Sequence, residues 1–197
     1  MKSLLAEKLS GKQIILASQS PRRQRLLKEL ELDFEVRPVD IEETYPDHLK
    51  REEIPVYLSE LKAHAFSFNS LADNYLVITA DTIVWLENSV LSKPKDKDDA
   101  VRILKRLSGN KHEVYTGVSI SSRDKRQSFY ACSEVFFRVL KKQEIDYYID
   151  KFEPFDKAGA YGIQEWIGYI GIEKITGSFY NVMGLPTQKL YDELLNF

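Results

Sequence analysis

The chain has 197 residues, of which 43% are hydrophobic and 29% are charged. This balance is typical of a soluble folded protein with a sizeable core, and it excludes an intrinsically disordered chain. The 28 basic and 30 acidic residues give a net charge of -2, so no overall positive field attracts nucleic acid or an anionic membrane. An RNA-binding module is therefore disfavoured, whereas a small anionic ligand needs only a local basic patch.

Cysteine content and apolar runs bear on where the protein works. Cys132 is the only cysteine, which excludes an internal disulfide and a metal site made of several thiolates. Residues 1–12 lack the apolar core of a signal peptide, and no apolar run approaches the ~20 residues that span a bilayer. We therefore expect a cytoplasmic protein with no membrane partner, folded as a single domain over residues 1–197.

Residues 13–31 predict a strand, a tight turn and a helix. The apolar run 14–17 is typical of a short buried strand. Ser20 is a favourable N-cap, and Pro21 suits the first helical position because its missing N–H would be unpaired there anyway. The helix is therefore expected to begin at Pro21.

The turn before this helix has the composition of an anion site. Its hydroxyl and guanidinium groups match phosphate oxygens, and the helix N-terminus adds N–H donors and a positive dipole end. These groups belong to Ser18, Ser20, Arg22 and Arg23. An ordinary capped helix with solvated arginines explains the same residues, and the pattern alone does not decide between the two.

The next elements predict a βαβ unit. Residues 33–39 alternate as a strand and lead into the acidic loop 40–43, and residues 52–69 have the apolar spacing of a helix. Lys62 and His64 lie in that helix. A solvated surface lysine and an ordinary histidine are the simpler interpretations of these two residues.

The strongest buried-strand signal is the run 75–80, which ends in Asp81 and Thr82 before residues 83–86 continue extended. A buried carboxylate is costly without partners, so Asp81 should meet a cation, a metal or several N–H donors. A structural role in capping the next turn would also account for it.

The remaining patterns predict further elements. Lys93 precedes a proline and should lie in a loop. Asp96 should cap a helix that ends near Gly109. The later expectations are strands at 112–121 and 127–139 in a hairpin, a helix at 141–152, a small-residue run at 158–164, a strand at 167–175, a loop at 177–184 and a helix at 187–195. The expected fold class is α/β, with an early parallel unit and a later antiparallel hairpin.

Six segments together resemble the Maf family, also called septum formation inhibitor-like proteins. They are Leu16–Arg23, Ala80–Val84, Ser92–Asp96, His112–Val118, Asp156–Gln164 and Asn181–Pro186, and they span nearly the whole chain. The resemblance implies an inosine triphosphatase-like fold, in which a mixed, twisted sheet with flanking helices forms two lobes around a central cleft. Tyr180 departs from the small residue expected before Asn181, which affects only the shape of that loop.

The resemblance also implies an activity, the hydrolysis of a nucleoside triphosphate to its monophosphate and pyrophosphate. Asp81 matches the family's proton acceptor. Three positions match the subgroup that acts on dTTP and UTP, namely Arg22, Thr82 and Gln164. The remaining polar pocket residues are Ser18, Arg23, Lys62 and Lys93 for phosphate, with Glu43 joining Asp81 as a metal ligand. Glu42 is one step away and competes with Glu43 for this role.

The chemistry of the residues agrees with that implication. A triphosphate needs several cationic groups, and two carboxylates suit a divalent cation, Mg²⁺ or Mn²⁺, that bridges phosphate oxygens. Modified pyrimidine nucleotides are further candidate substrates, and a homodimer is left open. Two alternatives are a 7-methyl-GTP pyrophosphatase, against which Thr82 and Gln164 argue, and a non-catalytic nucleotide-binding regulator of septation, against which Asp81 argues.

Overall fold

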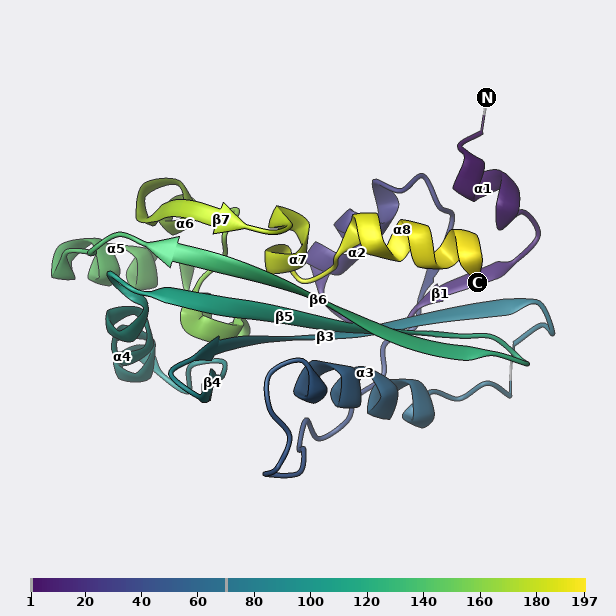
Figure 1. The fold of residues 1–197 in the computed structure, drawn as a ribbon, viewed down its shortest axis with the longest axis horizontal. Helices are drawn as coiled ribbons and strands as arrows, with labels where there is room; N and C mark the ends of the chain where they lie inside the picture. Colours follow the sequence, from purple (N-terminus) through teal and green to yellow (C-terminus); the bar gives the residue numbers. More distant parts are fainter. Residues whose placement is uncertain (1, 70) are drawn as a thin grey trace. The chain divides into compact units, whose positions relative to one another are not determined.

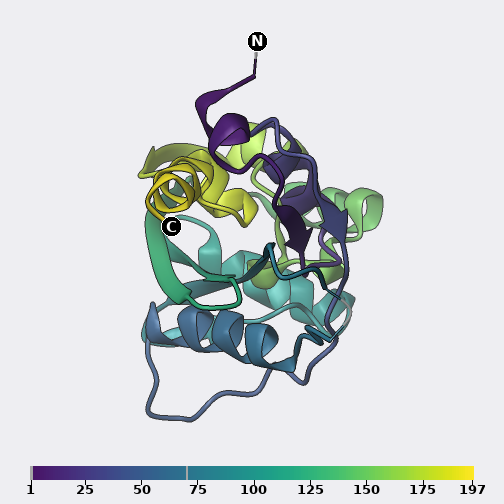
Figure 2. The same ribbon diagram turned by 90° about the vertical axis from the view of Figure 1, so that its right-hand side faces the viewer.

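A computed structural model describes residues 2–69 and 71–197 (Figures 1 and 2). The chain divides into two compact units. Unit 1 takes the chain up to Asp81, the hairpin Thr116–Ala131 and the end Gly184–Phe197. Unit 2 takes Thr82–Tyr115 and Cys132–Met183. Three long strands contribute residues to both: β3 (Tyr75–Leu86), β5 (Lys111–Ser121) and β6 (Arg126–Phe137).

The strands form one mixed sheet in the order β2-β1-β3-β5-β6-β7, with β4 paired to β3. β1 pairs in parallel with both β2 and β3, whereas β3–β4 and β6–β7 are antiparallel. The strands not yet bounded are β1 (Gln13–Leu16), β2 (Glu35–Val36), β4 (Ser89–Leu91) and β7 (Ile172–Thr176). The predicted α/β class and the early parallel βαβ unit are therefore confirmed.

In unit 1, helices cover both faces of the strands. Figures 1 and 2 show α3 on one face and α2 and α8 on the other. The helices of this unit are α1 (Leu4–Lys8), α2 (Pro21–Lys28), α3 (Glu53–Ala65) and α8 (Thr187–Asn196). A small apolar cluster beneath them joins β1 and β3 to the end of α3, through Ile15, Ala17, Phe66 and Val77.

In unit 2, α4 and α5 pack together beside a larger apolar core (Figure 1). Ala100, Ile103, Leu104 and Leu107 of α4 are buried, as their helical spacing predicts. The helices here are α4 (Lys97–Leu107), α5 (Lys142–Phe152), α6 (Trp166–Gly171) and α7 (Phe179–Met183), with the 3₁₀ turns η1 (Pro154–Asp156) and η2 (Ala158–Ala160).

Several predicted boundaries were wrong. The predicted strand at 33–39 is reduced to Glu35–Val36. Both residues are exposed, so the alternation of polar and apolar residues in this segment does not correspond to one buried face. The helix predicted over 52–69 ends at Ala65, because Phe66 has an extended backbone and packs into the apolar cluster of unit 1. Two short elements, α1 and β4, were not predicted.

The predicted strand at 167–175 is instead α6 followed by β7. Ile167 and Gly171 are the buried residues of α6 and lie four apart, which is helical spacing. A Cβ at Gly168 would lie 1.9 Å from the Ile163 carbonyl oxygen, so this turn is held by a close backbone contact that a propensity scale does not register. The predicted loop at 177–184 likewise contains α7, whose Asn181 N–H donates to the Ser178 hydroxyl.

Candidate active site

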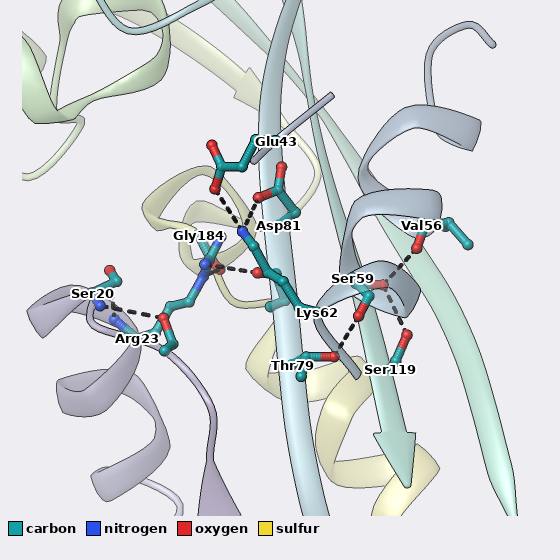
Figure 3. Close-up of polar contacts among 12 residues, drawn as sticks. Ser20, Arg23, Glu43, Val56, Ser59, Lys62, Thr79, Asp81, Ser119 and Gly184 are labelled. Carbon is teal, nitrogen blue, oxygen red and sulfur yellow. Dashed lines mark hydrogen bonds and ion pairs between the residues drawn. The ribbon is translucent and has the colours of Figure 1, made fainter. Parts of the chain in front are cut away.

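The centre of the site is a buried ion pair at the end of the unit 1 part of β3. Asp81 is 6% exposed and Lys62 is 7% exposed. The Lys62 ammonium donates to Asp81 Oδ1 at 2.5 Å and to Glu43 Oε1 at 2.7 Å (Figure 3). The expectation that Asp81 meets a cation is confirmed, and the interpretation of Lys62 as a solvated surface residue was wrong.

The three charged side chains differ in their exposure to water. Asp81 and Lys62 have almost no contact with water, so each charge depends on ionic partners inside the protein. Glu43 differs because its side chain is 40% exposed and comes from a segment outside the helices and strands. Between the two neighbouring acidic residues, Glu43 is the one whose carboxylate reaches Lys62.

The local sequence at the start of α2 folds as predicted. The Ser20 hydroxyl caps the helix by accepting from the Arg23 N–H, and Pro21 is its first residue. The buried Ser18 hydroxyl accepts from the Ser20 N–H at 3.2 Å, which tightens the turn between β1 and α2. Arg22 lies half-buried in the first turn of α2, and the N-terminal turn of a helix is a favourable place for an anion.

Arg23 is tied to the backbone around Asp81. Its Nε donates to the Gly184 carbonyl at 2.8 Å (Figure 3). Its Nη1 donates to the Ala80 carbonyl, also at 2.8 Å. Burial lowers the pKa of Arg23, and the negative charge of Asp81 opposes that shift. Arg23 therefore fixes the end of β3 next to Asp81, a structural task that the sequence did not indicate.

The other three predicted site residues belong to unit 2. Thr82 follows Asp81 in β3, is half-buried and faces the opposite side of the strand. Lys93 is exposed in the segment between β4 and α4, as expected for a lysine before proline. Gln164 is the last residue of the small-residue run 158–164, and its buried Oε1 has no hydrogen-bond partner among the described residues.

The segment that carries Gln164 is held by a network that sequence reasoning missed. The buried Lys157 pairs with Asp156 at 2.6 Å and with Glu165 at 3.1 Å. The Tyr148 hydroxyl donates to Glu165 and accepts from the Gly162 N–H at 3.0 Å. Both ends and the middle of the run are thereby fixed. The available signal was the pair of charged residues that flank an otherwise small and apolar stretch.

His112 is buried in unit 2, where its Nε2 lies 2.8 Å from the Tyr161 hydroxyl. Burial lowers its pKa to about 3, so this ring is neutral at neutral pH and a weak proton acceptor. His112 is a core residue, which leaves Asp81 as the stronger candidate base.

The carboxylates of Asp81 and Glu43 fit a divalent cation that also binds phosphate. Both carboxylates contact the same atom, the Lys62 Nζ, so their oxygens lie close together. Mg²⁺ commonly binds one or two carboxylates together with substrate phosphates and water. Within residues 2–69 and 71–197, no cluster of three or more His, Cys, Asp or Glu side chains is placed for a metal. A cation here would therefore need further oxygen ligands from the substrate and from water.

Comparison with known proteins identifies the family of this chain. The family model described as "Maf-like protein" matches residues 13–197, and the chain belongs to that family. It is 53% identical over 194 residues to a protein of Parabacteroides distasonis named dTTP/UTP pyrophosphatase, covering 98% of this chain and 100% of that one.

Two further relatives carry the same name. That of Bacteroides thetaiotaomicron is 54% identical over 92% of this chain and 94% of its own length, and that of Porphyromonas gingivalis strain W83 is 49% identical over 98% of both. Among solved structures, the Ham1 protein of Staphylococcus aureus aligns with a TM-score of 0.43 at 21% identity, over 64% of this chain and 71% of that one. Among the described residues, no helix is both long and apolar enough to cross a membrane.

Proposed function

We propose that this chain hydrolyses dTTP and UTP to the nucleoside monophosphate and pyrophosphate, with residues 1–197 acting as one functional unit. The names and full-length match of the relatives support the reaction. The observation that carries it is the buried pair of Asp81 and Lys62, because a pure binding protein would not need a buried carboxylate at this point. The direct test is the release of monophosphate and pyrophosphate from dTTP.

In this mechanism Asp81 takes a proton from the attacking water. The water oxygen bonds to the α-phosphorus, the bond from that phosphorus to the bridging oxygen breaks, and pyrophosphate leaves with the electron pair. Lys62 lies beside Asp81 and is placed to offset negative charge as the phosphates arrive. Asp81 and Glu43 would hold a Mg²⁺ or Mn²⁺ ion, which when bound neutralises phosphate oxygens.

Phosphate binding is assigned to the N-terminus of α2 and to cationic side chains. The turn of Ser18 and Ser20 leads into the first turn of α2, where helix N–H groups favour an anion, and Arg22 adds a guanidinium group. Arg23 and Lys93 remain assigned to phosphate from the family resemblance, although Arg23 also bonds two backbone carbonyls.

Replacing Arg22 with alanine tests this assignment. We expect a rise of roughly tenfold in KM for dTTP, because a charge-assisted contact to phosphate is lost. The melting temperature should change little, since a partly solvated arginine at a helix start contributes little to folding. Steady-state kinetics and thermal unfolding measure the two effects, and Arg25→Ala on the exposed side of α2 is the matched control. A large drop in melting temperature with normal kinetics would make Arg22 a structural residue.

Recognition of the base is assigned to Gln164. A buried acceptor without a donor is costly, and the N3–H group shared by thymine and uracil would satisfy its Oε1. Cytosine has an acceptor at N3 in place of this donor, so a cytosine bound in the same pose would leave Oε1 unpaired. The same side chain keeps its amide donors for a base carbonyl, which suits the edge common to dTTP and UTP.

Replacing Gln164 with glutamate removes those donors and keeps an acceptor. We expect kcat/KM for dTTP and UTP to fall by about 10–100-fold, and by clearly less for CTP. The measurement compares dTTP, UTP, CTP and 7-methyl-GTP in the variant and in Gln143→Glu, which adds the same charge at an exposed position of α5. An equal loss on all four nucleotides would remove Gln164 from base recognition.

Oligomeric state is a separate expectation. The sequence left a homodimer open, and light scattering of the purified protein with and without nucleotide measures it directly.

A further inference from the structure

α3 contacts β3 through two polar contacts that follow one another along the strand. In the first contact Lys62 donates to Asp81, and in the second the Thr79 hydroxyl donates to the Ser59 carbonyl at 2.7 Å (Figure 3). Thr79 and Asp81 are two apart on one face of a strand, and Ser59 and Lys62 are three apart on one face of a helix. A sliding of α3 that broke one contact would therefore disturb the other.

A chain of buried hydroxyl groups extends from the second contact. Ser59 Oγ donates to the Val56 carbonyl at 2.8 Å and lies 2.9 Å from Ser119 Oγ of β5. Ser59, Thr79 and Ser119 are all 0% exposed. Because water cannot replace a partner here, a displaced α3 would leave buried hydroxyl groups unsatisfied, so the network favours one position of the helix.

Gly117 allows α3 to come this close. A Cβ built at Gly117 would lie 2.3 Å from the carbonyl carbon and oxygen of Pro55 and 2.4 Å from the Val56 nitrogen, so the first turn of α3 touches the strand backbone. Gly117 and Ser119 are two apart in β5 and share the face that meets α3. This contact gives a physical reason for the glycine in the His112–Val118 motif.

We propose that Thr79, Ser59 and Gly117 are positioning residues that hold Lys62 against Asp81. The proposal rests on the function proposed above, which gives Lys62 and Asp81 their roles. None of the three positioning residues touches the substrate; each acts by fixing the position of α3 on the sheet.

The test is a double-mutant cycle that combines Thr79→Val with Lys62→Met. Valine keeps the shape of threonine and removes the hydroxyl group that reaches α3. We expect Thr79→Val to lower kcat/KM for dTTP about tenfold in the wild-type chain, and less than about twofold when Lys62 is already methionine. Thr79→Ser restores the hydroxyl group and should recover most of the activity.

The matched control is Ser121→Ala. Ser121 is buried on the same face of β5 and accepts from Arg126 Nε at 3.1 Å, so its loss removes a buried hydroxyl group that does not bond to α3. Its kcat/KM should stay within about twofold of wild type. Urea unfolding of every variant checks that the assayed protein is folded, and Ser119→Ala takes the place of Thr79→Val if the latter is not.

Two results would overturn the proposal and have different meanings. An equal loss from Thr79→Val in both backgrounds would show that the hydroxyl network acts on the fold as a whole and not through Lys62. Wild-type kcat/KM in Lys62→Met alone would remove Lys62 from the proposed function, and the positioning role would fall with it.

Discussion

Replacing Asp81 with asparagine is expected to lower kcat for dTTP by roughly 10²–10⁴-fold, the usual cost of losing a general base. The amide has nearly the same shape as the carboxylate, but it does not accept a proton at neutral pH. Lys62 still has Glu43 as a partner, so the loss of stability should be smaller than the 3–5 kcal/mol typical of a fully orphaned buried charge. The protein should stay folded and retain nucleotide binding.

The measurement pairs steady-state turnover with calorimetric binding of dTTP. Asp33→Asn, which changes an exposed acidic residue of unit 1 outside the ion-pair cluster, is the matched control and should keep wild-type turnover. Equal turnover in the wild type and in Asp81→Asn would remove Asp81 from the chemical step.

Replacing Gly117 with alanine is expected to lower the free energy of unfolding by about 3 kcal/mol or more, at the upper end of overpacking costs. The added methyl group would meet the backbone of Pro55 and Val56 at 2.3–2.4 Å. A backbone cannot rotate away as a side chain can, so α3 must shift as a unit. Urea unfolding followed by circular dichroism measures the loss.

Gly11→Ala is the control that separates the steric clash at Gly117 from the backbone strain of placing alanine where glycine stood. Gly11 has a φ of +79° and nothing within 4 Å of a built Cβ, so alanine there meets only left-handed backbone strain of about 1–2 kcal/mol. Gly117→Ala should cost clearly more. A smaller loss than that of Gly11→Ala would mean that the contact between α3 and β5 yields easily.

The elements that the sequence predicted well are those with local signals. Ser20 and Pro21 mark the start of α2 through capping and fixed φ, and Asp96 caps α4 by accepting from the Asp99 N–H. Such signals act within one helical turn. α6 was misassigned because Ile167, Ile170 and Ile172 favour a strand by composition, whereas the close approach of Gly168 to the Ile163 carbonyl is not visible in a pattern of apolar residues.

The sequence predicted which charged groups the site needs, but it did not predict how their side chains pack. A carboxylate at the end of a buried strand required a cation, and Lys62 provides it. Lys62 lies four residues after Leu58, on the apolar stripe of α3, and this spacing was a signal of burial that went unused. The network of Lys157, Glu165 and Tyr148 depends on tertiary contacts, and its signal in the sequence was limited to the charged residues that flank the small-residue run.

The most direct test of the proposed function is a nucleotide panel assayed with the purified protein and Mg²⁺ or Mn²⁺. We expect kcat/KM for dTTP and UTP to exceed that for CTP and 7-methyl-GTP by at least about tenfold. Monophosphate and pyrophosphate should appear in equal amounts, and chelation of the cation should abolish both. A preference for 7-methyl-GTP, release of orthophosphate, or binding of dTTP without turnover would contradict the proposed activity.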